Sequence, residues 1–371
     1  MNFEHEKFKI YTNIGVAYFK LGKIHKSIEA FKNSIQNNPN YGLAHKNLGI
    51  SYLELGLFEK STESFVSALK LNKNDYQTQA YLINSFNFNK PKVNNLHPLI
   101  EINDKINKLI EKKSLNYKYK NKNIKILLEK SNYIINNFND VLLLNETQIF
   151  RKNSENLNCG RHFKVFNEFN VIPKYCFSCY KIQINVSNVS ELIKLYFYFN
   201  NLNLKENNIR KCMVELRENV LGNYKGYLYA SSITEAKNLE KEIKNDLINY
   251  KINFKKIEIK HGCTEYYEVY KLYKNIKEDI TDKIYKKEWY NIEKEFDRKN
   301  LIEESNLEKV YDNTLNKFNL SDFLIIKNWI LYAEITNDFS YKEIFKYDVN
   351  SDHLSELDIK KIKMRSKDLI N

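Results

Sequence analysis

The sequence predicts an α+β protein with helical hairpins at its N-terminus, a small mixed domain in its centre and further helices at its C-terminus. Three observations support this prediction. Residues 8–41 and 42–75 are two copies of the same sequence unit. Residues 180–261 alternate between strand and helix patterns, and in residues 277–371 the apolar residues have the spacing of helices. A repeated unit of this length is typical of stacked helical hairpins, whereas alternating patterns indicate a sheet covered by helices.

The repeated unit is defined by glycines and aromatic residues at equal positions. Gly15 aligns with Gly49, and Phe31 aligns with Phe65. A glycine in the first helix of each hairpin lets the second helix approach closely, and the aromatic ring fills the remaining space. The other matching pairs are Ile14 with Leu48, Tyr18 with Tyr52, Leu21 with Leu55, Gly22 with Gly56 and Ser27 with Ser61.

This pattern resembles the tetratricopeptide repeat (TPR) family over residues 8–88. A third unit begins at Tyr76 and is interrupted at Pro91, so we expect residues 76–88 to form a capping helix. The resemblance implies a groove that binds a protein or peptide. The residues expected to line this groove are Thr12, Val16, Phe19, Lys46, Asn47 and Ile50. Their mixed apolar and basic character favours an amphipathic partner segment with some acidic residues.

Composition limits the class of protein further. Of the 371 residues, 43% are hydrophobic and 14% aromatic, which is enough for the cores of two or three domains. Residues 1–10 carry charges where a secretory signal needs an apolar run, and Lys327 and Asn328 interrupt the apolar stretch 323–335. We therefore expect a cytoplasmic protein without membrane insertion. The formal charge of +13 favours acidic or nucleic-acid partners, and AT-rich codons are a second explanation for the many lysines.

The sequence suggests four segments. Residues 1–90 carry the repeats and the capping helix, and residues 91–140 form a basic helical linker region. Residues 141–276 form a central domain that contains the cysteines, and residues 277–371 form a helical region. In the last segment, the apolar helix at 320–335 is expected to pack against the central domain.

The central domain follows the order β-α-β-β-α-β. Strand patterns occur at residues 180–186, 209–216, 224–230 and 254–260, with helices that begin near Ser190 and Ser232. Ser232 and Glu235 form a capping box for the second of these helices. This order of elements is that of a ferredoxin-like fold.

The cysteines give the clearest chemical signal. Cys159 and His162 form one closely spaced pair, and Cys176 and Cys179 form a second. Two such pairs suit a tetrahedral zinc site. The strand directions place further cysteines near the same end of the sheet, as substitute ligands or as small core residues; these are Cys212 and Cys263. An iron–sulfur cluster is the alternative cofactor, on Cys176, Cys179, Cys212 and Cys263.

The third strand of the central domain also resembles the start of the RNP1 motif of RNA-recognition motifs. Lys225, Tyr227 and Tyr229 would share one sheet face, flanked by Lys181 and Gln183 from the first strand. Gln183 stands where that family places an aromatic residue.

Three classes of function therefore stay open. The first is an interaction protein that combines repeats with a metal-stabilised α+β domain. The second is a metal- or iron–sulfur-dependent enzyme that uses the cysteines, and the third is an RNA-binding protein. The sequence contains no P-loop, Rossmann glycine run, GxSxG or HExxH motif.

Overall fold

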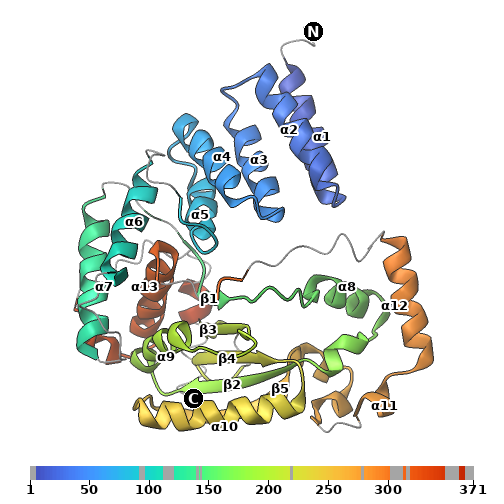
Figure 1. Cartoon of the computed structure of the whole chain (residues 1–371), viewed down its shortest axis with the longest axis vertical. Coiled ribbons are helices and arrows are strands. Elements are labelled where there is room, and N and C mark those ends of the chain that lie inside the picture. The colour runs from blue at the N-terminus through green and yellow to red at the C-terminus, as the bar shows by residue number, and fades with distance from the viewer. Residues whose placement is uncertain are drawn as a thin grey trace. The chain divides into compact units, whose positions relative to one another are not determined.

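The chain forms two compact units. Figure 1 shows the whole chain, coloured by residue number from the N-terminus to the C-terminus. The first contains Met1–Glu146, Asn316–Leu331 and Ile344–Ile359, and the second contains Thr147–Leu315, Tyr332–Glu343 and Lys360–Asn371. The division into four segments stays a prediction. The computed structural model describes residues 6–91, 97–111, 121–138, 142, 144–217, 220–276, 280–300, 312–314, 318–346 and 359–363.

The first unit begins with two helical hairpins and a fifth helix, as the repeated sequence predicted (Figure 1). These helices are α1 (Lys7–Lys20), α2 (Ile24–Asn37), α3 (Gly42–Glu54), α4 (Phe58–Leu71) and α5 (Tyr76–Ser85). Each pair α1–α2 and α3–α4 packs as an antiparallel hairpin, and α3 and α5 extend the stack by contacting the preceding helix.

The glycines of the repeat have two separate roles. A Cβ atom added at Gly15 would lie 2.5 Å from the ring of Phe31, and the corresponding closest approach at Gly49 is 2.6 Å. These positions therefore accept no side chain unless the ring moves. Gly22 and Gly56 instead follow the first helix of each hairpin with φ values of 72° and 65°. Glycine adopts this left-handed backbone without a steric penalty.

Three more helices belong wholly or largely to the first unit: α6 (Pro98–Glu111), α7 (Asn121–Asn136) and α13 (Leu320–Ile335). At the start of α13, the Asn319 side chain donates to the Asn87 side chain at 3.0 Å. Asn328 within α13 donates to the carbonyl of Leu144 at 2.6 Å. Through Leu331, α13 thus belongs to the first unit. Its last residues, from Tyr332, belong to the second unit, where the Tyr332 hydroxyl donates to the Glu215 carbonyl at 3.1 Å. The expected packing against the central domain is therefore present only at the end of the helix. Because its apolar residues surround its whole circumference, the sequence does not indicate which neighbour it packs against.

Within the described residues, the second unit contains a sheet of five antiparallel strands in the order β1-β3-β4-β2-β5. The strands are β1 (Gln148–Arg151), β2 (Tyr180–Val186), β3 (Arg210–Val214), β4 (Tyr224–Ala230) and β5 (Phe254–His261). With α9 (Val189–Asn201) and α10 (Ile233–Asn249), strands β2 to β5 form the predicted β-α-β-β-α-β order, and their arrangement in the sheet is ferredoxin-like. Strand β1 is an addition at the edge that the sequence did not predict.

Helices α9 and α10 cover one face of this sheet (Figure 1). A Cβ atom added at Gly226 would collide with Leu195 of α9, so α9 lies directly against β4. The side chains of opposite parity point to the other face, where Lys181 pairs in register with Tyr229, and Lys211 pairs with Tyr227. Side chains from α8 (Cys159–Phe169) and from the segment after β5 line a cavity over this second face.

Within the segment predicted to be helical, residues 280–299 form two helices, α11 (Ile280–Ile284) and α12 (Lys287–Lys299), which are separated because Lys286 has an extended backbone. Helix α12 packs against α8, and Trp289 and Phe296 join a buried aromatic cluster. This cluster also contains Val165, Val171, Ile172, Phe177, Tyr266 and Tyr273. In the described part of the chain, no helix is both long and apolar enough to cross a bilayer.

Candidate functional site

The structure separates the predicted groove residues of the first unit into exposed and buried positions. The prediction that Thr12 lines the groove is wrong, because Thr12 is only 2% exposed and its hydroxyl lies 2.8 Å from that of Ser34. It therefore joins α1 to α2 and cannot contact a bound peptide. The other five residues are partly exposed on α1 and α3: Val16, Phe19, Lys46, Asn47 and Ile50.

Val16 and Lys46 make contacts within the first unit that affect how they can bind a partner. Val16 packs against a buried cluster that contains Phe31 and Tyr52. The ammonium of Lys46 lies 3.2 Å from Asp75 and 3.2 Å from the amide oxygen of Gln77, both near the start of α5. Lys46 thus helps to align α3 with α5, and only part of its hydrogen-bonding capacity is left for a partner.

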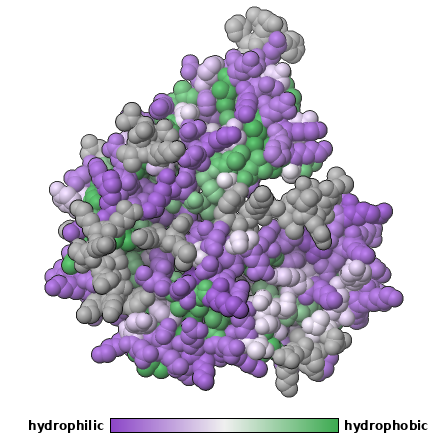
Figure 2. All heavy atoms as spheres, viewed as in Figure 1, coloured by the Kyte–Doolittle hydropathy of each residue, from purple (hydrophilic) through white to green (hydrophobic). Residues whose placement is uncertain are grey.

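The surface of the first unit carries many exposed apolar side chains. Figure 2 shows one face on which apolar residues gather over the N-terminal helices, bordered by hydrophilic ones. In this N-terminal region, the large hydrophobic residues with more than a third of their surface exposed are Ile10, Ile14, Leu21, Leu43, Leu57, Leu71 and Tyr76. A concentration of this kind is typical of a surface that contacts another protein.

The second unit places the cysteines at two separate sites. Cys212 lies on the helix-covered face, opposite Gly226 of β4, and is 2% exposed. It is therefore a core residue, and the prediction that it could serve as a substitute metal ligand is wrong. The other four approach one end of the sheet: Cys159, Cys176, Cys179 and Cys263.

His162 does not join these cysteines, which corrects the predicted Cys-x2-His pair. Its ring stacks on Tyr175 with 5.6 Å between centroids, and it is 7% exposed. Burial and the neighbouring Arg161 guanidinium lower the pKa of His162 to about 4, against the opposing charges of Glu293 and Asp297. The imidazole is therefore neutral near pH 7 and serves in packing.

Among the described residues, no group of three or more His, Cys, Asp or Glu side chains is arranged to hold a metal ion. The predicted zinc ligand set is thus not assembled. The four neighbouring cysteines are free thiols, as is Cys212. Zinc at these residues stays a prediction, and so does an iron–sulfur cluster.

The thiols at the end of the sheet differ in acidity. The neighbouring Cys263 raises the pKa of Cys176, whereas the neighbouring Cys176 lowers the pKa of Cys263. The Lys181 ammonium acts in the same direction on Cys263. Burial and the nearby Cys263 raise the pKa of Cys179 to about 12, and the same causes raise that of Cys159. Cys263 is therefore the most easily ionised thiol of the four.

The predicted RNA-binding face is also corrected. Its five residues share one sheet face as expected, but Tyr227 is only 5% exposed, so no base can stack on its ring. Lys225 is fully buried, with its ammonium 2.8 Å from Glu215. The Gln183 side-chain amide is buried and donates to Asn185. An open stacking surface for nucleic acid is therefore not formed.

This face instead encloses a cavity of about 410 Å³, which we call the lysine cavity. Its cationic wall consists of Lys181, Lys211 and Arg217, and Cys159, Cys179 and Cys263 lie at its end. Its other lining residues are Gln148, Leu157, Phe163, Met213, Val214, Glu215, Leu216, Tyr227, Tyr229, Gly262, Thr264 and Glu265. A volume of this size suits a small molecule.

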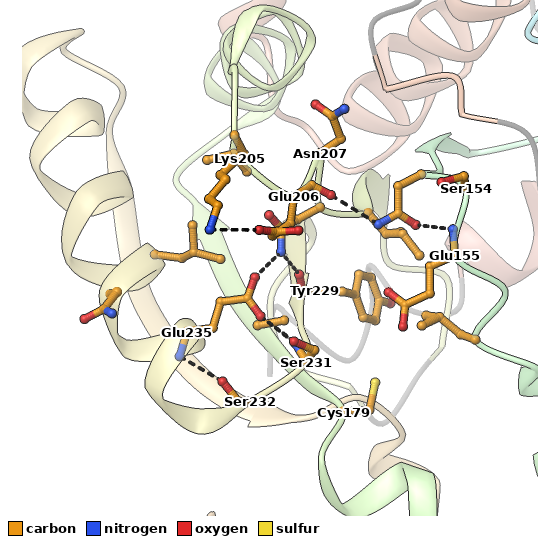
Figure 3. A pocket seen from close by; sticks show the side chains of 18 of the residues that line it. Ser154, Glu155, Cys179, Lys205, Glu206, Asn207, Tyr229, Ser231, Ser232 and Glu235 are labelled. Atoms are coloured by element: carbon orange, nitrogen blue, oxygen red, sulfur yellow. Dashed lines mark hydrogen bonds and ion pairs between the residues drawn. The ribbon is translucent and has the colours of Figure 1, made fainter.

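A second, wider cavity of about 900 Å³ lies at the start of α10 and shares Tyr229 and Cys179 with the lysine cavity (Figure 3). Its polar groups bond to one another. The carboxylate of Glu235 accepts from Asn208 at 2.7 Å and from the Ser231 hydroxyl at 2.8 Å. The predicted capping contact is also present, since the Ser232 hydroxyl accepts from the Glu235 backbone. These groups hold the start of α10 in place, which accounts for their positions.

Sequence reasoning missed Lys211, Glu215 and Arg217 as residues of a site. Lys211 occupies the same parity on β3 as Met213, and the register places it opposite Tyr227. The alternation in strand β3 could have indicated its face, but the register between β3 and β4 is needed to bring it beside Tyr227.

Residues 8–41 match the tetratricopeptide repeat family, which confirms the predicted resemblance for this N-terminal segment. The class defined by fold and surface is thus a repeat-containing protein with an attached α+β unit. A search of curated proteins found no match for the chain.

Proposed function

We propose that the first unit binds a segment of another protein on the surface formed by α1, α3 and α5. The tetratricopeptide repeat supports a role in protein–protein interaction. The observation that carries the proposal is the repeated packing of Gly15 on Phe31 and of Gly49 on Phe65, which closes each hairpin tightly. The first helices of successive hairpins also contact one another, α1 with α3 and α3 with α5. Such a stack presents a continuous concave surface to a partner.

The chemistry of this surface favours an amphipathic partner segment. Val16, Phe19 and Ile50 are partly exposed and can bury apolar side chains of a partner. Lys46 retains a hydrogen-bond donor beyond its contacts with Asp75 and Gln77, and this donor can contact an acidic residue. We expect affinity to come chiefly from the apolar contacts, because exposed ion pairs contribute little.

Affinity capture with the full chain tests this proposal. Ile50→Asp places a charge on the proposed surface, whereas Gln36→Asp places the same charge on an exposed site of α2. Partners identified by mass spectrometry are expected to be retained by Gln36→Asp and lost by Ile50→Asp, with both variants folded by circular dichroism. Equal capture by both variants would contradict the proposal.

The zinc-stabilised domain and the cytoplasmic location also remain proposals. The free thiols Cys159, Cys176, Cys179 and Cys263 support a reducing compartment. If zinc binds them, Cys176→Ser and Cys179→Ser are expected to lower metal content and melting temperature together, because metal binding contributes to folding. Elemental analysis of the purified chain and of both variants measures this directly, and unchanged values in the variants would reject the zinc site.

A further inference from the structure

The lysine cavity contains two lysines without a carboxylate partner. The Lys181 ammonium, 8% exposed as a residue, donates to the carbonyl of Gly262 at 2.9 Å. The Lys211 ammonium lies 3.4 Å from the amide oxygen of Gln148. Among the described residues neither ammonium has an ion pair. Lys181 is buried and Lys211 is partly buried. An ammonium withdrawn from water without a counter-ion is unfavourable, and a bound anion would relieve this cost.

The carboxylates of the cavity are already used by other cations. Glu215 accepts hydrogen bonds from the Arg217 side chain at 2.8 and 2.9 Å, from the Arg217 backbone at 3.1 Å and from Lys225 at 2.8 Å. Burial would raise the pKa of Glu215, but these bonds outweigh it and lower the pKa to about 2. Glu265 lies 3.8 Å from Arg217. The positive charge of the two lysines therefore remains available to a ligand.

Tyr227 connects the two lysines. Its ring centroid is 5.5 Å from the Lys181 ammonium and 5.0 Å from the Lys211 ammonium. Among the described residues, its hydroxyl has no hydrogen-bond partner. The hydroxyl can thus donate to an anion that both lysines contact. Apolar side chains line other parts of the same cavity: Leu157, Phe163, Met213 and Leu216.

We propose that the lysine cavity binds a small organic anion, with a carboxylate or phosphate group between Lys181 and Lys211 and an apolar body beside Phe163 and Leu216. The enclosed volume of about 410 Å³ limits this ligand to a small molecule and excludes a nucleic-acid strand laid across the sheet. The assignment is independent of the partner surface of the first unit.

The position of Cys263 provides a probe of the cavity. Its thiol lines the same cavity as Lys181 and Lys211, and the Lys181 ammonium acts on it electrostatically, so a reagent inside the cavity at Cys263 lies near the lysines. Iodoacetate carries a carboxylate, whereas iodoacetamide is a neutral molecule of similar size. With either reagent the Cys263 thiolate attacks the methylene carbon, a thioether forms and iodide leaves.

The experiment measures the alkylation rates of Cys263 in the reduced, EDTA-treated full chain at pH 7 by peptide mass spectrometry. We expect the ratio of the iodoacetate rate to the iodoacetamide rate to be at least about 10-fold higher than for free cysteine, because the lysines concentrate the anion. Benzoate and phenyl phosphate, added separately, should slow the iodoacetate reaction. The more effective of the two identifies whether the natural ligand carries a carboxylate or a phosphate.

Variants assign the effect to the cavity. Lys211→Met and, independently, Lys181→Met should bring the rate ratio close to that of free cysteine. Lys256→Met, at an exposed position of β5 outside the cavity, should leave the ratio unchanged. A wild-type ratio equal to that of free cysteine, without protection by benzoate or phenyl phosphate, would overturn the proposal. Protection by an RNA oligonucleotide alone would overturn it in favour of nucleic acid.

Discussion

At the scale of single residues, the two repeat glycines are fixed by the rings that face them. In Gly49→Ala, the new methyl group would lie 2.6 Å from the Phe65 ring, so the ring or the helix must shift. We expect a loss of roughly 1–3 kcal/mol in the free energy of unfolding. Gly42→Ala at the start of the same helix meets its nearest atoms at 3.7 Å. It should be neutral or stabilising by up to about 1 kcal/mol, and chemical denaturation of both variants compares the two sites.

Lys211 gives a prediction about pH. Burial and then the charges of Lys181 and Arg217 lower the pKa of Lys211 to about 8, against Glu215 and Glu265. Below pH 8 the folded protein therefore holds a charged, unfavourable lysine, and this cost fades as pH rises toward the unfolded pKa of about 10.4. The other titratable groups that line the cavity are Tyr227, Tyr229, Cys159, Cys179 and Cys263.

Without added ligand, Lys211→Met is therefore expected to stabilise the protein by roughly 1–2 kcal/mol at pH 7 and by clearly less at pH 10. Urea denaturation at both pH values measures the difference, with Lys256→Met as the exposed control. A gain that is equal at the two pH values would show that the charge of Lys211 is not the cause.

The sequence allowed several of these residues to be interpreted correctly. The glycine and aromatic positions of the repeat, and the common face of Lys181, Tyr227 and Tyr229, follow from spacing and alternation. Burial of that face could not be predicted, because the covering residues come from distant segments. His162 failed as a ligand for a related reason, since helix α8 directs its ring to Tyr175.

At the scale of elements, Arg161 joins α8 to α12. Its guanidinium donates to both carboxylate oxygens of Asp297 at 2.8 Å and also to Glu293. Glu293 in turn accepts from the Lys174 backbone at 3.0 Å and from the Tyr285 hydroxyl at 2.7 Å. One arginine thus fixes the helix that presents Cys159 to the lysine cavity.

Arg161→Met is expected to destabilise the second unit by roughly 2–4 kcal/mol, because it leaves the buried carboxylate of Glu293 and the partly exposed carboxylate of Asp297 without their cation. Replacing Glu293 with Gln as well should recover part of this loss. A double-mutant cycle in chemical denaturation measures the coupling between the two residues. Additive effects of the two substitutions would show that the contact contributes little.

The elements themselves were predictable to different degrees. Strands β2 and β4 and helix α13 have the predicted bounds, because alternation and apolar runs were continuous there. Strand β1 was missed because it is short and gains its place only by pairing with β3. A sequence pattern predicts where a helix or strand lies along the chain, whereas the element that it packs or pairs with depends on the tertiary structure.

At the scale of the whole molecule, each unit carries the surface for a different proposed kind of recognition. The first unit offers an exposed helical surface, and the second encloses a cavity with cationic walls. Exposed apolar surface is suited to a protein partner, and an enclosed cavity is suited to a small ligand. The sequence predicted the first of these roles through its repeat, while the second required the tertiary structure.

The two roles are expected to be separable. Ile50→Asp on the repeat surface should abolish partner capture and leave the alkylation ratio at Cys263 unchanged. Lys211→Met should have the opposite effects. Measuring both properties on both variants tests this, and loss of both properties in either variant would show that the surface and the cavity do not act independently.

The proposed anion site of the α+β unit lies between Lys181 and Lys211. Crystals of the full chain grown with 4-iodobenzoate test it most directly, because anomalous scattering locates the iodine atom. We expect an iodine peak inside the lysine cavity, with the carboxylate between the two ammonium groups. Iodine bound only elsewhere, with water alone in the cavity, would contradict it.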